Sequence, residues 1–201
     1  MPMRIAVCVS GRGSNLRALL DALAGSDRAR VVLVVSNRAD APALALARER
    51  GISALALANH QDAAEWLRLL EGAQIDLLVL AGYLKLVPAS VIAAYRGRII
   101  NIHPALLPDF GGPGMYGHHV HEAVLKSGAR VSGATVHLVD EQYDRGTILA
   151  QSRVPVLADD TAETLGARVL EVEHRLLPAV VLRAAEVGHA IPLPAPLELH
   201  A

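Results

Sequence analysis

An amide and an imidazole two positions apart are the side chains of this sequence best suited to chemistry. Asn101 and His103 stand at the end of an apolar run, and Pro104 follows them. Side chains two positions apart in a strand project to the same face, and a proline ends a strand because it lacks a ladder donor. An amide donor beside an imidazole suits a site where negative charge develops on a reacting oxygen. The partner Asn101 and the proline- and glycine-rich segment 104–117 favour this role over that of an ordinary packed histidine.

A second candidate is the loop Ser10-Gly11-Arg12-Gly13-Ser14-Asn15, which follows one apolar run and precedes a helical segment. Its glycines allow the backbone to turn sharply and approach a ligand, and a helix N-terminus offers free N–H groups. Ser14 and Asn15 add side-chain donors, so the loop suits a phosphate. The same residues also fit an ordinary strand–helix turn with a Ser or Asn cap. Leu16 stands where a full Gly-x-Gly-x-x-Gly motif would have its third glycine, and the sequence leaves both readings open.

An acidic segment, 140–146, lies between two β-type runs and contains Asp140, Glu141 and Asp144. Such a turn is usually only solvated. A carboxylate from it placed beside His103 would raise the pKa of the imidazole and favour its charged form. The residues alone do not place it there.

Three more histidines, His118, His119 and His121, lie close together in the sequence. Positions 118 and 121 fall near one face of a helix, which makes a metal site conceivable. No Cys or carboxylate ligands stand nearby at a spacing typical of metal sites, so we predict no metal and expect these histidines to line a pocket or face water. His137 should face the same side as Thr135, in a packed, a supporting or a direct role.

The elements that must position these residues alternate between strands and helices. Short runs that are apolar on both faces predict buried strands, at 5–9, 31–35, 52–57, 75–80 and 98–102. Helical spacing of apolar residues separates the first four of them. This pattern favours a mostly parallel, Rossmann-like open sheet with helices on both faces, an α/β fold.

The C-terminal part of the chain changes in texture. Residues 131–139 and 147–156 predict an antiparallel hairpin, and a long amphipathic helix is expected from Thr161 to about Glu186. No linker divides the chain, so we predict a single domain over 1–186 followed by an extended tail over 187–201.

Composition excludes several classes of protein. The chain has 201 residues, of which 52% are hydrophobic, and 19 basic residues stand against 20 acidic ones. This balance provides no cationic field, so we expect no nucleic-acid partner, and no apolar run is long enough to span a bilayer. Cys8 is the only cysteine and excludes an internal disulfide. We expect a cytoplasmic protein that binds small molecules, with no membrane partner, as a monomer or homodimer.

The motifs closely resemble those of the phosphoribosylglycinamide formyltransferases, within the formyltransferase superfamily, over nearly the whole chain. The Asn-Ile-His-Pro segment is typical of the superfamily, and the Ser-Gly-x-Gly-Ser-Asn loop narrows the resemblance to this branch. The matching segments are 9–16, 80–83, 101–108, 133–137, 144–146 and 173–178.

The resemblance implies a reaction in which the amine of glycinamide ribonucleotide attacks the formyl carbon of 10-formyltetrahydrofolate, in purine biosynthesis. The folate is a formyl-donor co-substrate, and no metal is implied. Protonated His103 would stabilise the oxyanion of the tetrahedral intermediate, and Asn101 would donate an amide hydrogen bond. Asp144 would keep His103 charged and help relay protons through water to the departing folate nitrogen.

The resemblance also assigns binding residues. Gly13, Ser14 and Asn15 would hold the substrate phosphate, and Glu173 would contact the ribonucleotide. The folate would be bound by Leu84, Lys85, Leu86, Val87, Asn101, Asp140, Glu141 and Asp144, with the backbone of 140–144 meeting the pterin. A formyltransferase domain over 1–186 would then comprise a phosphate-binding half, about 1–100, and a folate and catalytic half, about 101–186. Members of the family usually have a basic residue before the third helix, and in this sequence His60 stands at that position.

Three alternatives remain. A 10-formyltetrahydrofolate hydrolase or a methionyl-tRNA formyltransferase would share the superfamily motifs, but each carries an added domain for which we see no room. A non-catalytic sugar-phosphate- or folate-binding protein would be expected to lack part of the set Asn101, His103 and Asp144, which is complete here.

Overall fold

A single seven-stranded sheet organises the protein. The computed structural model describes residues 1–190, and the strands lie in the order β3-β2-β1-β4-β5-β6-β7. Their bounds are β1 Met3–Val9, β2 Ala29–Ser36, β3 Ser53–Ala56, β4 Leu77–Leu80, β5 Ile99–His103, β6 Val131–Leu138 and β7 Ile148–Pro155. The first five strands are parallel, and β6 and β7 run antiparallel to their neighbours. The predicted α/β fold is therefore confirmed, with antiparallel pairing beginning at β5–β6.

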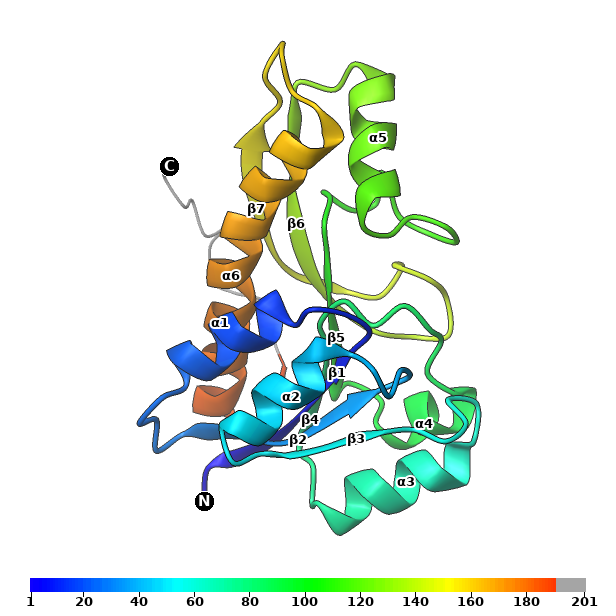
Figure 1. Ribbon diagram of the computed structural model, residues 1–201, viewed down its shortest axis with the longest axis vertical. Helices are drawn as coiled ribbons and strands as arrows, with labels where there is room; N and C mark the ends of the chain where they lie inside the picture. The colour runs from blue at the N-terminus through cyan, green and yellow to red at the C-terminus, as the bar shows by residue number, and fades with distance from the viewer. Residues whose placement is uncertain (191–201) are drawn as a thin grey trace.

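Helices cover both faces of this sheet (Figure 1). Their bounds are α1 Ser14–Ala22, α2 Pro42–Glu49, α3 Ala63–Gly72, α4 Ala89–Ala94, α5 His118–Ser127 and α6 Ala162–Val187. One buried core joins α1, α2 and α6 to the sheet, and a second joins α3 and α4 to the opposite face. α5 packs against α6 at the β6–β7 end. Because both faces are covered, the parallel strands are apolar on both sides.

Local sequence explains where the long helix α6 begins and ends. The Thr161 side chain accepts from the N–H of Thr164, and the Thr164 hydroxyl accepts from the N–H of Thr161, which forms a capping box for α6. Gly188 ends α6 in a left-handed conformation. The six-residue helix α4 was missed, because it is too short to show an apolar repeat. The predicted extended tail lies mostly outside the described residues. Within residues 1–190, no helix is long and apolar enough to cross a membrane.

The order of the strands places a cleft at the carboxyl ends of the central strands. The connection from β1 leads to β2 on one side, whereas β4 and β5 lie on the other. In open α/β sheets, ligands bind outside the carboxyl ends of the strands where the strand order reverses. Here the carboxyl ends of β1, β4 and β5 converge at that point, and each carries one of the motifs singled out in the sequence.

Candidate active site

A cleft of about 650 Å³ opens at the carboxyl ends of these strands. It brings together segments from the whole length of the chain: the loop after β1, the segment after β4, the end of β5, the loop before α5, the acidic segment after β6 and one face of α6. Asn101, His103 and Asp144, which the resemblance implicates in catalysis, all line it.

The pairing of β5 with β6 sets the positions of the two key side chains. Asn101 lies opposite His137, and His103 lies opposite Thr135. The Nδ2 atom of Asn101 is 3.1 Å from Nε2 of His137. The Thr135 hydroxyl donates to the carbonyl of Ala105 at 2.6 Å and so ties the chain after β5 to β6.

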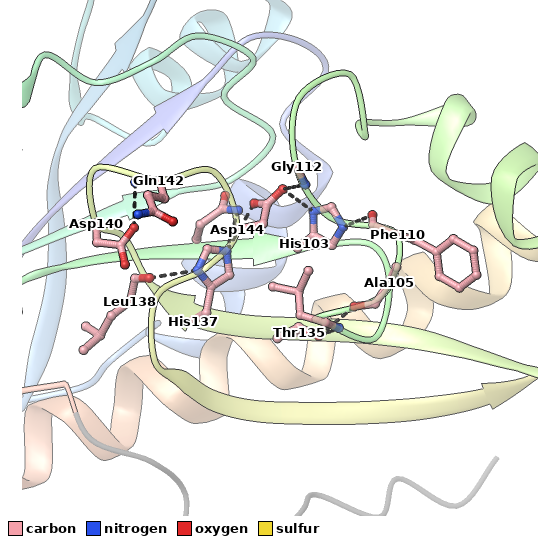
Figure 2. A network of polar contacts seen from close by, with 12 residues as sticks. His103, Ala105, Phe110, Gly112, Thr135, His137, Leu138, Asp140, Gln142 and Asp144 are labelled. Atoms are coloured by element: carbon pink, nitrogen blue, oxygen red, sulfur yellow. Dashed lines mark hydrogen bonds and ion pairs between the residues drawn. The ribbon is translucent and has the colours of Figure 1, made fainter.

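His103 is held between a carboxylate and a backbone carbonyl (Figure 2). Its ring is 3% exposed. Nε2 lies 2.9 Å from the carbonyl oxygen of Phe110, and Nδ1 lies 3.7 Å from Oδ2 of Asp144. The N–H of Gly112 donates to the same Asp144 oxygen at 2.9 Å. The loop before α5 and the acidic segment therefore meet over the end of β5.

The expected carboxylate is beside His103, but burial of the imidazole outweighs the rise in pKa that this carboxylate causes. Burial lowers the pKa of His103 below its ordinary value, and the opposing attraction of Asp144 does not offset this desolvation of the imidazolium. Burial would by itself raise the pKa of the Asp144 carboxyl, but its pKa is lowered overall, by the hydrogen bond from Gly112 and by the neighbouring rings of His137 and His103 whenever they are protonated. The ionised carboxylate therefore faces an imidazole that is predominantly neutral at neutral pH.

The loop after β1 brings the N-terminus of α1 close to the cleft. Gly13 has a φ of 79°, and a Cβ there would lie 2.6 Å from Cβ of Ala43. A glycine is therefore required both by conformation and by space. The N-cap is Gly13 itself, without a side-chain cap, so neither Ser14 nor Asn15 acts as the ordinary cap of the alternative reading.

Asn15 turns instead to the long C-terminal helix. Its Nδ2 donates to Oε2 of Glu173 at 2.7 Å, across 158 positions of sequence. Its Oδ1 is buried and has no hydrogen-bond partner among the described residues. Glu173 is 6% exposed, and burial raises the pKa of its carboxyl to about 7. Asn15 and Glu173 both line the cleft, so it holds an amide oxygen and a carboxyl that are not fully satisfied by the protein.

The segment after β4 forms an apolar wall of the same cleft. All four residues from Leu84 to Val87 line it, and Leu84 and Leu86 are more than half exposed. The Ser10 hydroxyl accepts from the N–H of Leu84 at 2.8 Å and donates to Oδ1 of Asn37 at 2.6 Å. This contact joins the segment to the loop after β1.

The acidic segment contributes unequally. Asp140 and Asp144 line the cleft, whereas the side chain of Glu141 does not. The carboxylate of Glu141 pairs instead with Arg96 at 2.8 Å. The expectation that Glu141 meets the folate therefore rests on its backbone alone. His60 does not line this cleft; its carbonyl accepts from Nε1 of Trp66 at 3.0 Å.

The histidines of α5 separate into two environments. His118 and His119 are exposed and lie 3.1 and 3.6 Å from the Glu122 carboxylate, and His118 also lines the cleft. His121 is buried against Gly166 of α6 and lines the cleft. In the described part of the chain, no group of three His, Cys, Asp or Glu side chains is arranged to hold a metal ion, and the expectation of no metal stays a prediction.

From the sequence, no individual role was assigned to Ser10 or Arg12 within the candidate loop, and the role of His137 was left open. Arg12 lines the cleft beside Asn15, and its place inside the glycine loop could have identified it. Ser10 joins two cleft segments, and His137 contacts both Asn101 and Asp144. The alternation of residues in the strand predicted that His137 faces the same side as Thr135. The sequence did not predict that His137 lies opposite Asn101 across the sheet.

Known proteins resemble the chain over most of its length. The formyl transferase family model matches residues 3–181. A chloroplastic phosphoribosylglycinamide formyltransferase of Arabidopsis thaliana is 47% identical over 186 residues, covering 89% of this chain and 64% of the relative. A phosphoribosylglycinamide formyltransferase of Mycobacterium tuberculosis is 42% identical over 192 residues, covering 93% and 87%.

Solved structures agree with these relatives. The crystal structure of phosphoribosylglycinamide formyltransferase from Brucella melitensis has a TM-score of 0.82 at 42% identity and covers 97% of this chain and 100% of that one. The chain spans less than two thirds of the Arabidopsis relative, and the bacterial proteins match it nearly end to end. The chain belongs to the formyl transferase family, in its phosphoribosylglycinamide formyltransferase branch.

Proposed function

We propose that this protein transfers the formyl group of 10-formyltetrahydrofolate to the amine of N1-(5-phospho-D-ribosyl)glycinamide, in purine biosynthesis. The observation that carries the proposal is the convergence of Asn101, His103 and Asp144 in one cleft with the loop after β1. In this cleft the donors Asn101 and His103 lie between the loop after β1, which can bind a phosphate, and the apolar segment 84–87, which can bind a ring system. The names of the relatives support the same reaction.

In the proposed reaction the substrate amine attacks the formyl carbon, and the formyl oxygen becomes an oxyanion. An N–H of Asn101 and the ring of His103 would donate to this oxygen. The Nε2–H of His103 is donated to the Phe110 carbonyl in this structure. Donation to the oxyanion therefore requires the substrate oxygen to replace that carbonyl as the acceptor.

Two protons must move for the reaction to finish. The attacking nitrogen loses one, and the departing folate nitrogen gains one when its bond to the formyl carbon breaks. His103 and Asp144 are titratable groups at the reacting end of the cleft, and we propose that they carry these protons, directly or through water. Although His103 is predominantly neutral, the carboxylate at 3.7 Å would stabilise the positive charge that its imidazole takes up transiently.

Substrate binding divides between two ends of the cleft. The N–H groups at the start of α1, with Gly13, Ser14 and Asn15, would hold the phosphate. Glu173 and the unpartnered amide oxygen of Asn15 would receive hydrogen bonds from the ribonucleotide. The folate would lie along the four residues Leu84, Lys85, Leu86 and Val87 and meet the backbone of 140–144.

The decisive experiment incubates the purified protein with a 10-formylfolate analogue and follows loss of the formyl group spectroscopically. We expect loss only when glycinamide ribonucleotide is supplied, together with formation of the N-formyl ribonucleotide. Formate release without the ribonucleotide would indicate the hydrolase alternative. Saturable binding of both ligands without turnover would indicate a non-catalytic binding protein.

The remaining expectations belong to the same proposal. We infer that the protein acts in the cytoplasm, without a resident metal, as a monomer or homodimer. Cell fractionation, metal analysis and sedimentation would test these three points separately.

A further inference from the structure

We propose that His137 is a positioning residue of this site, held by the Leu138 carbonyl as the tautomer with hydrogen on Nδ1, so that its bare Nε2 accepts an N–H of Asn101. The inference rests on the proposed function for its catalytic meaning, but the tautomer itself is a property of the free protein. Figure 2 labels four residues of the network from which it follows, namely His103, His137, Leu138 and Asp144.

The first step is the contact on the far side of the His137 ring. Nδ1 lies 2.8 Å from the carbonyl oxygen of Leu138. A carbonyl oxygen only accepts hydrogen bonds, so Nδ1 must carry the hydrogen. In a neutral imidazole the other nitrogen, Nε2, is then an acceptor. His137 is 2% exposed, so bulk water has little access to either nitrogen.

The second step concerns what Nε2 meets. The Asn101 Nδ2 atom lies at 3.1 Å, within ordinary hydrogen-bond length, whereas Oδ1 of Asp144 lies at 3.5 Å. A protonated Nε2 would be drawn to the carboxylate and would repel the Asn101 amide hydrogens. The observed distances show the reverse preference and fit a bare Nε2.

His103 has the opposite tautomer. Its Nε2 lies 2.9 Å from the Phe110 carbonyl and must carry the hydrogen, and its Nδ1 lies 3.7 Å from Asp144. Asp144 is therefore flanked by two bare imidazole nitrogens, one from each histidine. The long distances on both sides are those expected when no hydrogen lies between the atoms.

This arrangement directs an incoming proton. His137 Nε2 is already occupied by the N–H of Asn101, whereas Nδ1 of His103 faces only the carboxylate. A proton that enters the network is thus held between His103 and Asp144, where the proposed reaction needs it. The same contact restrains the Asn101 amide and leaves its second N–H for the substrate oxygen.

The tautomers can be read directly by long-range ¹H–¹⁵N NMR of the histidine rings in the free protein. At pH about 8.5, well above the ordinary histidine pKa of about 6.5, we expect hydrogen on Nδ1 of His137 and on Nε2 of His103. The missing signals in His137→Gln and His103→Gln assign the two rings. A His137 with hydrogen on Nε2, or on both nitrogens, would overturn the proposal whether or not the protein transfers formyl groups.

A double-mutant cycle tests the positioning role. We expect His137→Leu to lower kcat roughly 10- to 100-fold with KM values changed less than about threefold, because only the orientation of a transition-state donor is lost. In the Asn101→Ala background the same substitution should lower kcat by less than about threefold. Additive effects would show that His137 only packs.

Two further variants control this cycle. His137→Gln keeps an acceptor oxygen on a side chain of similar length and should recover part of the lost kcat. His119→Leu removes an exposed histidine that has no part in the network and should leave kcat unchanged. If His137→Leu does not fold, the NMR result on the native protein still decides the tautomer.

Discussion

Replacing Glu173 with glutamine should change how the stability of the free protein depends on pH. The carboxyl group is 6% exposed, and burial raises its pKa from the ordinary 4.5 to about 7, against the opposing hydrogen bond from Asn15. In the unfolded chain this carboxyl titrates near 4.5. Between these two pH values the folded protein therefore keeps a proton that the unfolded chain has released.

The sign and size of the effect follow from this difference. The stabilisation from a protonated Glu173 is complete below pH about 4.5 and is lost as the pH rises to about 7. A change of about 2.5 pKa units corresponds to about 3 kcal/mol in the free energy of unfolding, as an order of magnitude. Glutamine cannot ionise and still accepts from Asn15, so Glu173→Gln should gain stability relative to the native protein by that amount over this range.

The assay is urea unfolding followed by circular dichroism from pH 4.5 to pH 8.5, with the slope against urea checked for constancy. Glu171→Gln removes an exposed carboxylate from the same helix and serves as the matched control. If the stability difference between the Glu173→Gln variant and the native protein did not change with pH, the buried carboxyl would not titrate as argued. A change shared by Glu171→Gln would instead reflect the general charge of the protein.

Further predictions concern the loop after β1 and the acid beside the histidine. Asp144→Asn should lower kcat at pH 7 roughly 10- to 1000-fold. The reason is that unit charges 3.7 Å apart interact by about 1 kcal/mol in water and about 4 kcal/mol at an effective dielectric constant of about 20. An unchanged kcat would show that Asp144 takes no part in the reaction. Gly13→Ala should destabilise the protein by about 2–4 kcal/mol in thermal or urea unfolding. Gly25→Ala, at a position with a similar φ but open space for a Cβ, should destabilise it by only about 1–2 kcal/mol. Equal losses of stability would mean that Ala43 moves aside at little cost. Arg12→Gln should raise KM for glycinamide ribonucleotide roughly 3- to 10-fold at low salt, and less at high salt; the same change with the dephosphorylated substrate would place the phosphate elsewhere.

Much of the fold could be predicted because it depends on local patterns. The parallel strands are short and apolar on both faces, and the helices between them carry apolar repeats, so element type and order were readable. The proline at the start of α2 and the Thr161 cap of α6 marked helix ends through local hydrogen bonding. The helix α4 was not readable, because six residues span too few turns to show a repeat.

The candidate site, too, could be predicted from the sequence only in part. The side-by-side placement of Asn101 and His103 followed from the two-residue period of a strand. The place of Asp144 near His103 was an expectation from the resemblance. The sequence did not show that burial of the imidazole outweighs the attraction of this carboxylate, because the cost of burying an imidazolium depends on the packing of several segments at once.

By itself the sequence determined which side chains stand at the ends of strands and at the start of a helix, and these are the places where an α/β sheet binds ligands. Only the tertiary structure decided which distant groups meet: Asn15 with Glu173, Asn101 with His137, and Glu141 with Arg96 rather than with the cleft. The physical reason is that a strand or helix is specified by residues a few positions apart, whereas burial, tautomer and pKa are set by atoms that the chain brings together from far along its length.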